Sequence, residues 1–160
     1  MSKGAFSVTP SDDRTNHSEP GLSAQNELID DLNILLEAER AGTRVAISSA
    51  KDTASADLKK FLASLKHDEA HWCDMLTRNI EKVNGTPSLR CGDFYDKAMA
   101  IDDILERLDF LNRGQAWVVR KLDDLIARVE NTELRSDLQL MHDNHRASIA
   151  ETTRILQAAK

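Results

Sequence analysis

Four polar residues interrupt otherwise apolar helical repeats, and all four are of types that hydrogen-bond or bind metals: Glu39, Glu69, Gln115 and His145. Each stands near the middle of a run in which apolar residues recur every three or four positions, the spacing of a core-facing helix side. An unpaired polar group in a core costs about 1–3 kcal/mol, and an isolated charge costs more. The two glutamates therefore need a proton, a cation or a hydrogen-bonding partner. Two carboxylates and an imidazole could hold a divalent metal ion together.

Four long helices are predicted to carry these residues, one on each helix. Ser23, Ser55 and Thr132 are of residue types that cap helix N-termini. The acidic pair at 102–103 also favours a helix start, because negative charge is stabilised by the positive end of the helix dipole. The predicted helices cover about residues 23–51, 55–83 and 101–129, and from 132 to about the last residue, 160.

The chain is predicted to form one domain preceded by an arm. Residues 1–22 contain two prolines, two glycines and many small polar residues without a periodic pattern, which predicts a disordered N-terminal arm. Residues 23–160 hold all four helices and are long enough to bury a core without disulfides.

The lengths of the connections predict the topology. Short connections join the first helix to the second and the third to the fourth, so each pair forms an antiparallel hairpin. Residues 84–100 form a long connection, in which FYDKAMA (94–100) could fold as a short helix. Extended, that connection reaches ~55 Å, more than the ~42 Å of a 28-residue helix. The sequence therefore predicts an all-α, ferritin-like four-helix bundle with a long crossover between the second and third helices.

Several motifs resemble the ferritin-like superfamily over about residues 25–158. LLEAERAG (35–42) resembles its first-helix motif, and DEAHW (68–72) and MHDNH (141–145) resemble its Glu-x-x-His motifs. LNRGQAWVVRKL (111–122), together with DEAHW, is similar to an uncharacterised bacterial branch of that superfamily. The resemblance implies a ferritin-like fold and a metal site with an altered set of ligands.

By this resemblance the metal ligands are Glu39, Glu69 and His145, with His142 as a further candidate in the place of a glutamate. The metal would be iron, manganese or zinc. Because fewer carboxylates remain than two divalent ions need, the site is expected to hold one ion or to be a degenerate dinuclear site. A site without any metal is the alternative.

Three further residues are expected to surround these ligands. Trp72 stands where the second helix of the superfamily has a histidine, and Gln115 stands where the third has a glutamate. Trp72 and Gln115 would shape the pocket next to the metal. Asn112 shares a helix face with Gln115, so either could face the centre of the bundle.

Two functions remain open from the sequence. The first is a metal-binding protein whose metal, if the protein is an enzyme, would support redox chemistry with O₂ or peroxide. The second is a metal-free helical bundle that acts as a dimeric structural or interaction protein. Its polar residues would then form a hydrogen-bonded network that fixes helix register.

Composition narrows the partners and the location. The net charge of −6 and the absence of a basic patch argue against nucleic-acid binding. No apolar run approaches the ~18 residues of a membrane span, and the N-terminus lacks a signal-peptide core. Two cysteines without metal-binding spacing are typical of reduced thiols. We therefore expect a cytoplasmic protein without a membrane partner, and by analogy a homodimer with an unknown small-molecule substrate.

Overall fold

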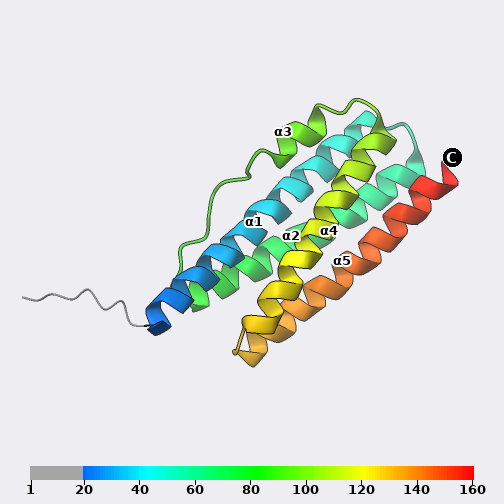
Figure 1. Cartoon of the computed structure of the whole chain (residues 1–160). Coiled ribbons are helices and arrows are strands. Elements are labelled where there is room, and N and C mark those ends of the chain that lie inside the picture. The colour runs from blue at the N-terminus through cyan, green and yellow to red at the C-terminus, as the bar shows by residue number, and fades with distance from the viewer. Residues whose placement is uncertain (1–19) are drawn as a thin grey trace, which may run out of the picture.

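The computed structural model describes residues 20–160, and every regular element in this range is a helix. Four long helices lie side by side, and a short helix lies outside them on the long connection (Figure 1). The prediction of an all-α fold is confirmed. Among the described residues, no helix combines the length and apolar character needed to cross a membrane. The helices are α1 (Pro20–Asp52), α2 (Ala56–Lys82), α3 (Phe94–Met99), α4 (Ile104–Arg128) and α5 (Thr132–Ala158).

Side-chain caps fix the starts of α2 and α4. The hydroxyl oxygen of Ser55 accepts a hydrogen bond of 3.2 Å from the backbone N–H of Leu58, as predicted for this cap. Asp103 Oδ1 accepts from the backbone N–H groups of Leu105 and Glu106 at 3.0 and 2.9 Å. The acidic pair thus does mark a helix start, but α4 begins three residues later than the apolar repeat predicted.

Two other helix starts differ from the prediction. Helix α1 begins at Pro20 and includes Ser23, which was expected to be its cap. Proline is tolerated in a first turn, because the N–H that it lacks would have no partner there. The predicted arm falls mainly on residues 1–19, which lie outside the described residues. Helix α5 is capped by Asn131 and not by Thr132. Asn131 Oδ1 accepts a hydrogen bond of 2.9 Å from the backbone N–H of Leu134.

The apolar core is divided into two clusters by the polar residues. On α1 the border runs between Leu36 and Val45, with the buried Glu39 between them, and α2 and α4 show the same change of cluster at Glu69 and Gln115. We call Glu39, Glu69, Gln115 and His145 the polar layer. One cluster includes Leu36, Trp72, Met75, Val118, Leu122 and Met141, and the other includes Val45, Leu62, Leu65, Leu108 and Leu111.

The connection between α2 and α4 runs along the whole of α1. At its beginning the carbonyl of Val83 accepts a hydrogen bond of 2.6 Å from Gln25, near the start of α1. Further on, the hydroxyl groups of Tyr95 and Ser48 lie 3.0 Å apart, near the end of α1. The connection therefore returns the chain to the end from which α2 began, as Figure 1 shows.

Arg107, a buried arginine that the sequence did not predict to be buried, holds the start of α4 next to the end of α1. Arg107 Nη1 lies 2.7 Å from Asp52 Oδ2 at the end of α1, and its Nε donates to the carbonyl of Ile101 at 2.9 Å. Since α4 starts where α1 ends, the two run in opposite directions. Helices α1 and α5 thus run one way, and α2 and α4 run the other way.

Candidate metal centre

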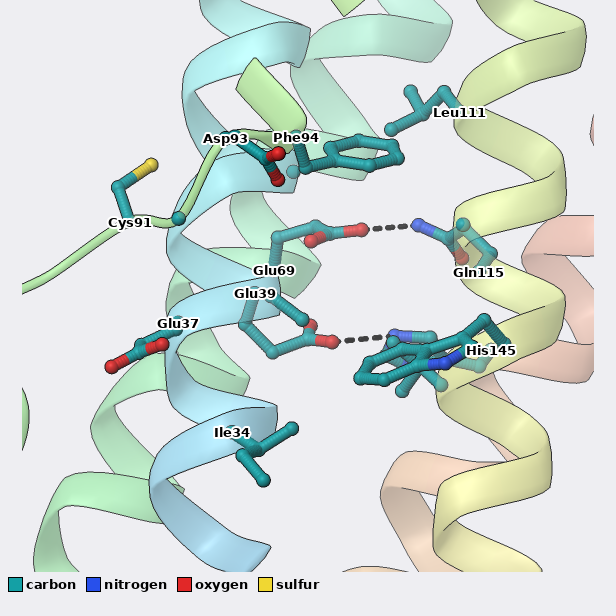
Figure 2. Close-up of a pocket in the computed structure, with 16 residues that line it drawn as sticks. Ile34, Glu37, Glu39, Glu69, Cys91, Asp93, Phe94, Leu111, Gln115 and His145 are labelled. Atoms are coloured by element: carbon teal, nitrogen blue, oxygen red, sulfur yellow. Dashed lines mark hydrogen bonds and ion pairs between the residues drawn. The ribbon is translucent and has the colours of Figure 1, made fainter. Parts of the chain in front are cut away.

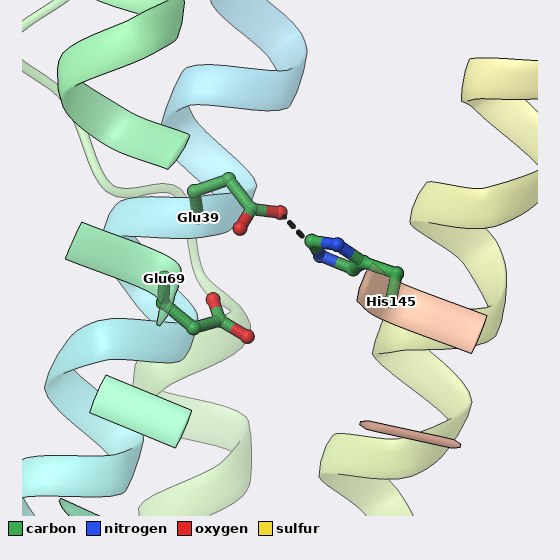
Figure 3. Close-up of side chains that lie close together, drawn as sticks. All are labelled: Glu39, Glu69 and His145. Carbon is green, nitrogen blue, oxygen red and sulfur yellow. Dashed lines mark hydrogen bonds and ion pairs between the residues drawn. The ribbon is translucent and has the colours of Figure 1, made fainter. Parts of the chain in front are cut away.

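Three buried side chains from three helices converge within the polar layer. Glu39 on α1, Glu69 on α2 and His145 on α5 each place one possible ligand atom so that these atoms lie within 4.8 Å of one another (Figure 3). Their exposed fractions are 1%, 3% and 2%. We call Glu39, Glu69 and His145 the trio. The sequence predicted them as ligands, and the fold brings them together.

His145 is oriented with its Nε2 atom toward the carboxylates. Its Nδ1 atom lies 3.0 Å from the carbonyl oxygen of Met141, one turn earlier on α5. Because a carbonyl can only accept, the ring hydrogen belongs on Nδ1. The Nε2 atom lies 3.0 Å from Glu39 Oε1. It either carries a second hydrogen toward that carboxylate or, without it, presents a lone pair to a metal ion.

Gln115 on α4 completes the polar layer by holding the carboxylate of Glu69. Its Nε2 group donates a hydrogen bond to Glu69 Oε1 (Figure 2). Two buried oxygen atoms of the layer, Glu39 Oε2 and Gln115 Oε1, have no hydrogen-bond partner among the described residues. An unsatisfied buried acceptor costs about 1–3 kcal/mol, so these atoms indicate a place for a cation or a donor group.

Electrostatics favour added positive charge at the trio. Burial raises the pKa of Glu69 well above its usual value, and the neighbouring Glu39 raises it further. Burial lowers the pKa of His145, but the charge of Glu39 and the hydrogen bond to it outweigh this, so the net shift is upward. Glu69 and His145 therefore bind protons more tightly than isolated side chains do. A divalent ion could replace these protons, because it supplies the same compensating charge.

A glycine makes room for the carboxylate of Glu69. Gly42 lies one turn after Glu39 on α1, and a Cβ atom built on it would stand 2.2 Å from Glu69 Oε2 and 2.8 Å from Glu69 Cδ. Any larger residue at this position would displace the carboxylate. The donor set and the two unpartnered oxygens together fit one divalent ion.

A pocket of about 410 Å³ opens beside the trio. Figure 2 shows it between α1 and α4, with the segment around Cys91, Asp93 and Phe94 along one side. We call it the site pocket. Its walls are mostly apolar, and its lining residues are Ile34, Glu37, Ala38, Glu39, Gly42, Glu69, Cys91, Gly92, Asp93, Phe94, Leu111, Gly114, Gln115, Trp117, Val118 and His145.

His142, predicted as a further ligand, does not reach the trio. It is buried on α5, but its Nε2 lies 2.7 Å from Asp123 Oδ1 on α4 and its Nδ1 lies 3.2 Å from Asp143 Oδ1. Three residues before His145, it is rotated by ~60° around the helix, which is enough to turn it from the core centre to the contact between α4 and α5. The prediction of His142 as a ligand is corrected accordingly.

Of the three residues expected to surround the ligands, only Gln115 lies against the trio. Gln115 faces the trio, whereas Asn112 donates to Thr153 Oγ1 on α5 at 3.3 Å. This decides the choice between Asn112 and Gln115. Trp72 donates from Nε1 to Asn144 Oδ1 at 2.9 Å and does not line the site pocket. The expectation that Trp72 shapes the pocket is therefore wrong, and Trp117 takes that place.

Part of the site was missed because it lies on the long connection. Gly92, with a φ of 65°, and Phe94 line the site pocket together with Cys91 and Asp93. Helical periodicity carries no information about a connecting segment. The usable signal was topological, since a crossover that runs along α1 must pass the level of Glu39.

The fold and the site define an all-helical protein with a buried cluster of two carboxylates and one imidazole. The chain belongs to the family described as a domain of unknown function, DUF6306, which matches residues 26–154. The matched range includes all four residues of the polar layer and the whole long connection. No curated protein matches the chain.

Proposed function

We propose that this protein binds one divalent metal ion through Glu39, Glu69 and His145. The observation that carries the proposal is the convergence of three possible ligand atoms, from three helices, within 4.8 Å in a buried layer. Two carboxylates balance the charge of one divalent ion, and the neutral Gln115 adds none for a second. Mixed oxygen and imidazole ligands suit iron, manganese and zinc.

A ferritin-like identity for the fold is part of the proposal. It is supported by two antiparallel helix pairs joined by one long connection, with the ligands facing inward from the long helices. When bound, the metal would supply Lewis-acid or redox chemistry, and the resemblance to ferritin-like proteins suggests O₂ or peroxide as the reactant. The protein's own part is to hold the ion and keep the site largely dry. Gln115 positions Glu69, and the Met141 carbonyl fixes the tautomer of His145.

The metal-free alternative has one observation in its favour. Each residue of the trio has a partner within the layer, because Glu39 pairs with His145 and Glu69 pairs with Gln115. Protons alone could close this network, which would then fix the register of the helices. Under this alternative the protein acts through its surface as a homodimer, which sedimentation equilibrium would test.

Metal content separates the two functions. Protein purified without an affinity tag is loaded with iron, manganese or zinc, passed over a desalting column and measured by elemental analysis. We expect about one equivalent of one of these metals, and its loss in Glu39→Gln and His145→Gln variants that keep their helical circular dichroism. His71→Gln is the matched control, because His71 is exposed on α2. Metal content below about 0.1 equivalent in the wild-type protein would rule out the proposal.

A further inference from the structure

The site pocket has the size and walls of a binding site for a small molecule. Its volume of about 410 Å³ lies within the ~300–1,000 Å³ typical of ligand sites. Ile34 and Ala38 on α1, Leu111 and Val118 on α4, and the rings of Phe94 and Trp117 form apolar walls. Trp117 keeps 36% of its surface exposed although it lines the pocket. An apolar or aromatic body would bury this surface.

The charge of the pocket selects against anions. Its lining contains four carboxyl groups and neither lysine nor arginine. Two of the four, Glu37 and Asp93, lie away from the trio. Asp93 pairs with Lys97 at 2.8 Å, which holds its pKa below the usual value, and Glu37 accepts a hydrogen bond of 2.5 Å from Ser88 Oγ. Arg90 Nε lies 3.8 Å from Glu37 Oε1, so each of these two carboxylates already has a cationic partner. The lining offers no lysine or arginine to a carboxylate or phosphate, and burying a charge between apolar walls without a partner is costly. The pocket therefore favours an uncharged ligand.

We infer that the site pocket binds a small uncharged molecule with an aromatic or other apolar body. This body lies between α1, Phe94 and Trp117, next to the trio. The pocket itself does not depend on a metal. That this ligand is the substrate of a metal-assisted reaction rests on the proposed function.

Binding is tested with 4-methylphenol, an uncharged ring with one hydroxyl group, and 4-methylbenzoate, the matched anion. Each is titrated into ¹⁵N-labelled protein, with and without one equivalent of Zn²⁺, and followed by amide chemical shifts. We expect the amides of Gly92 and Gly114, which line the pocket, to shift with 4-methylphenol. The amide of Gly85, outside the pocket, should stay in place. We expect 4-methylbenzoate to bind at least about tenfold more weakly.

Two variants locate the ligand. Ala38→Phe fills the pocket and should weaken 4-methylphenol binding at least about tenfold, while Ala63→Phe on the exposed side of α2 should leave it unchanged.

The outcomes separate this inference from the proposed function. Binding of 4-methylphenol without any binding of Zn²⁺ would support the pocket and count against the metal site. Binding of Zn²⁺ without shifts at Gly92 and Gly114, or equal binding of the phenol and the benzoate, would overturn the inference. The comparison of the two ligands uses wild-type protein, so the test stands even if a variant fails to fold.

Discussion

Replacing Gly42 with alanine should separate metal binding from folding. The new Cβ would stand 2.2 Å from Glu69 Oε2, which is closer than real Cβ contacts allow, and 3.2 Å from Glu69 Oε1. The helix backbone of α1 is packed on both core clusters, so the carboxylate of Glu69 must move instead. It then leaves the trio and the hydrogen bond from Gln115.

The effect on folding is small because two terms oppose each other. Alanine is favoured over glycine inside a helix by about 0.8–1.0 kcal/mol. Loss of the hydrogen bond between Gln115 and Glu69 costs about 1–3 kcal/mol. The metal-free variant is therefore destabilised by about 0–2 kcal/mol, which is well below the ~5–15 kcal/mol stability of a typical domain.

The effect on metal binding is large. Misplacing groups that only support a ligand weakens metal affinity by about 10–100-fold, and displacing the ligand itself should cost at least the upper value. At a free metal concentration of 100 Kd, binding stabilises the wild-type protein by about 2.7 kcal/mol, and after a 100-fold loss by about 0.4 kcal/mol. For a chain of this size the metal-induced rise in Tm would fall from about 5–11 °C to about 1–2 °C.

Differential scanning fluorimetry with and without metal measures both effects at once. Gly21→Ala is the control, because a Cβ there meets nothing within 4 Å. It should keep the full metal-induced rise in Tm. If Gly42→Ala also keeps the wild-type rise, Glu69 is not a ligand and the geometry of the trio has been misread.

Three further results are expected. In the presence of a chelator the free energy of unfolding should fall as pH rises from about 5 to 8. The reason is that folding raises the pKa of Glu69 above its usual 4.5 and that of His145 above its usual 6.5, so the folded state stays protonated to higher pH than the unfolded chain. Urea titrations at several pH values measure this dependence of stability on pH. The Glu69→Gln variant should show a weaker dependence. A rise in stability with pH would contradict the raised pKa values of both residues. Burial raises the pKa of Cys73 from 9.0 to about 12, so at pH 8 a Cys91→Ser variant should react with a disulfide reagent at least about tenfold more slowly when folded than in urea; similar rates would refute this. Asp52→Asn removes the carboxylate that pairs with the buried arginine of α4 and should destabilise the fold by about 1–3 kcal/mol in urea titrations, whereas an unchanged midpoint would mean that the pair is not formed in solution.

The helices were predictable because periodicity and caps act locally. Apolar repeats of three and four residues located the four long helices, and Ser55 capped α2 as its type suggested. The errors at the starts of α1, α4 and α5 have local causes as well. Asn131 and Thr132 are neighbouring residues that can both cap a helix, and asparagine is the stronger cap of the two.

The trio was predictable because two carboxylates and an imidazole on apolar helix sides would be buried without partners unless they pair with one another or bind the same cation. The sequence did not determine how far each helix is rotated about its own axis. A difference of one turn separates Gln115, which faces the trio, from Asn112, which faces α5, and His145 from His142. Such choices depend on how each helix is turned against its neighbours. The position of Phe94 depends on the path of a connection, which no repeat encodes.

The path of the long connection places the possible metal ligands and part of the pocket wall on different segments of the chain. The atoms that would hold a metal stand on helices packed into the core, so few substitutions there are tolerated. Part of the pocket wall stands on residues 91–94 of the connection, outside those helices. Substitutions in this segment can change which molecules enter without disturbing the trio or the core. Members of the family could therefore differ in ligand choice while keeping the same trio, and this connection is the first place to compare them.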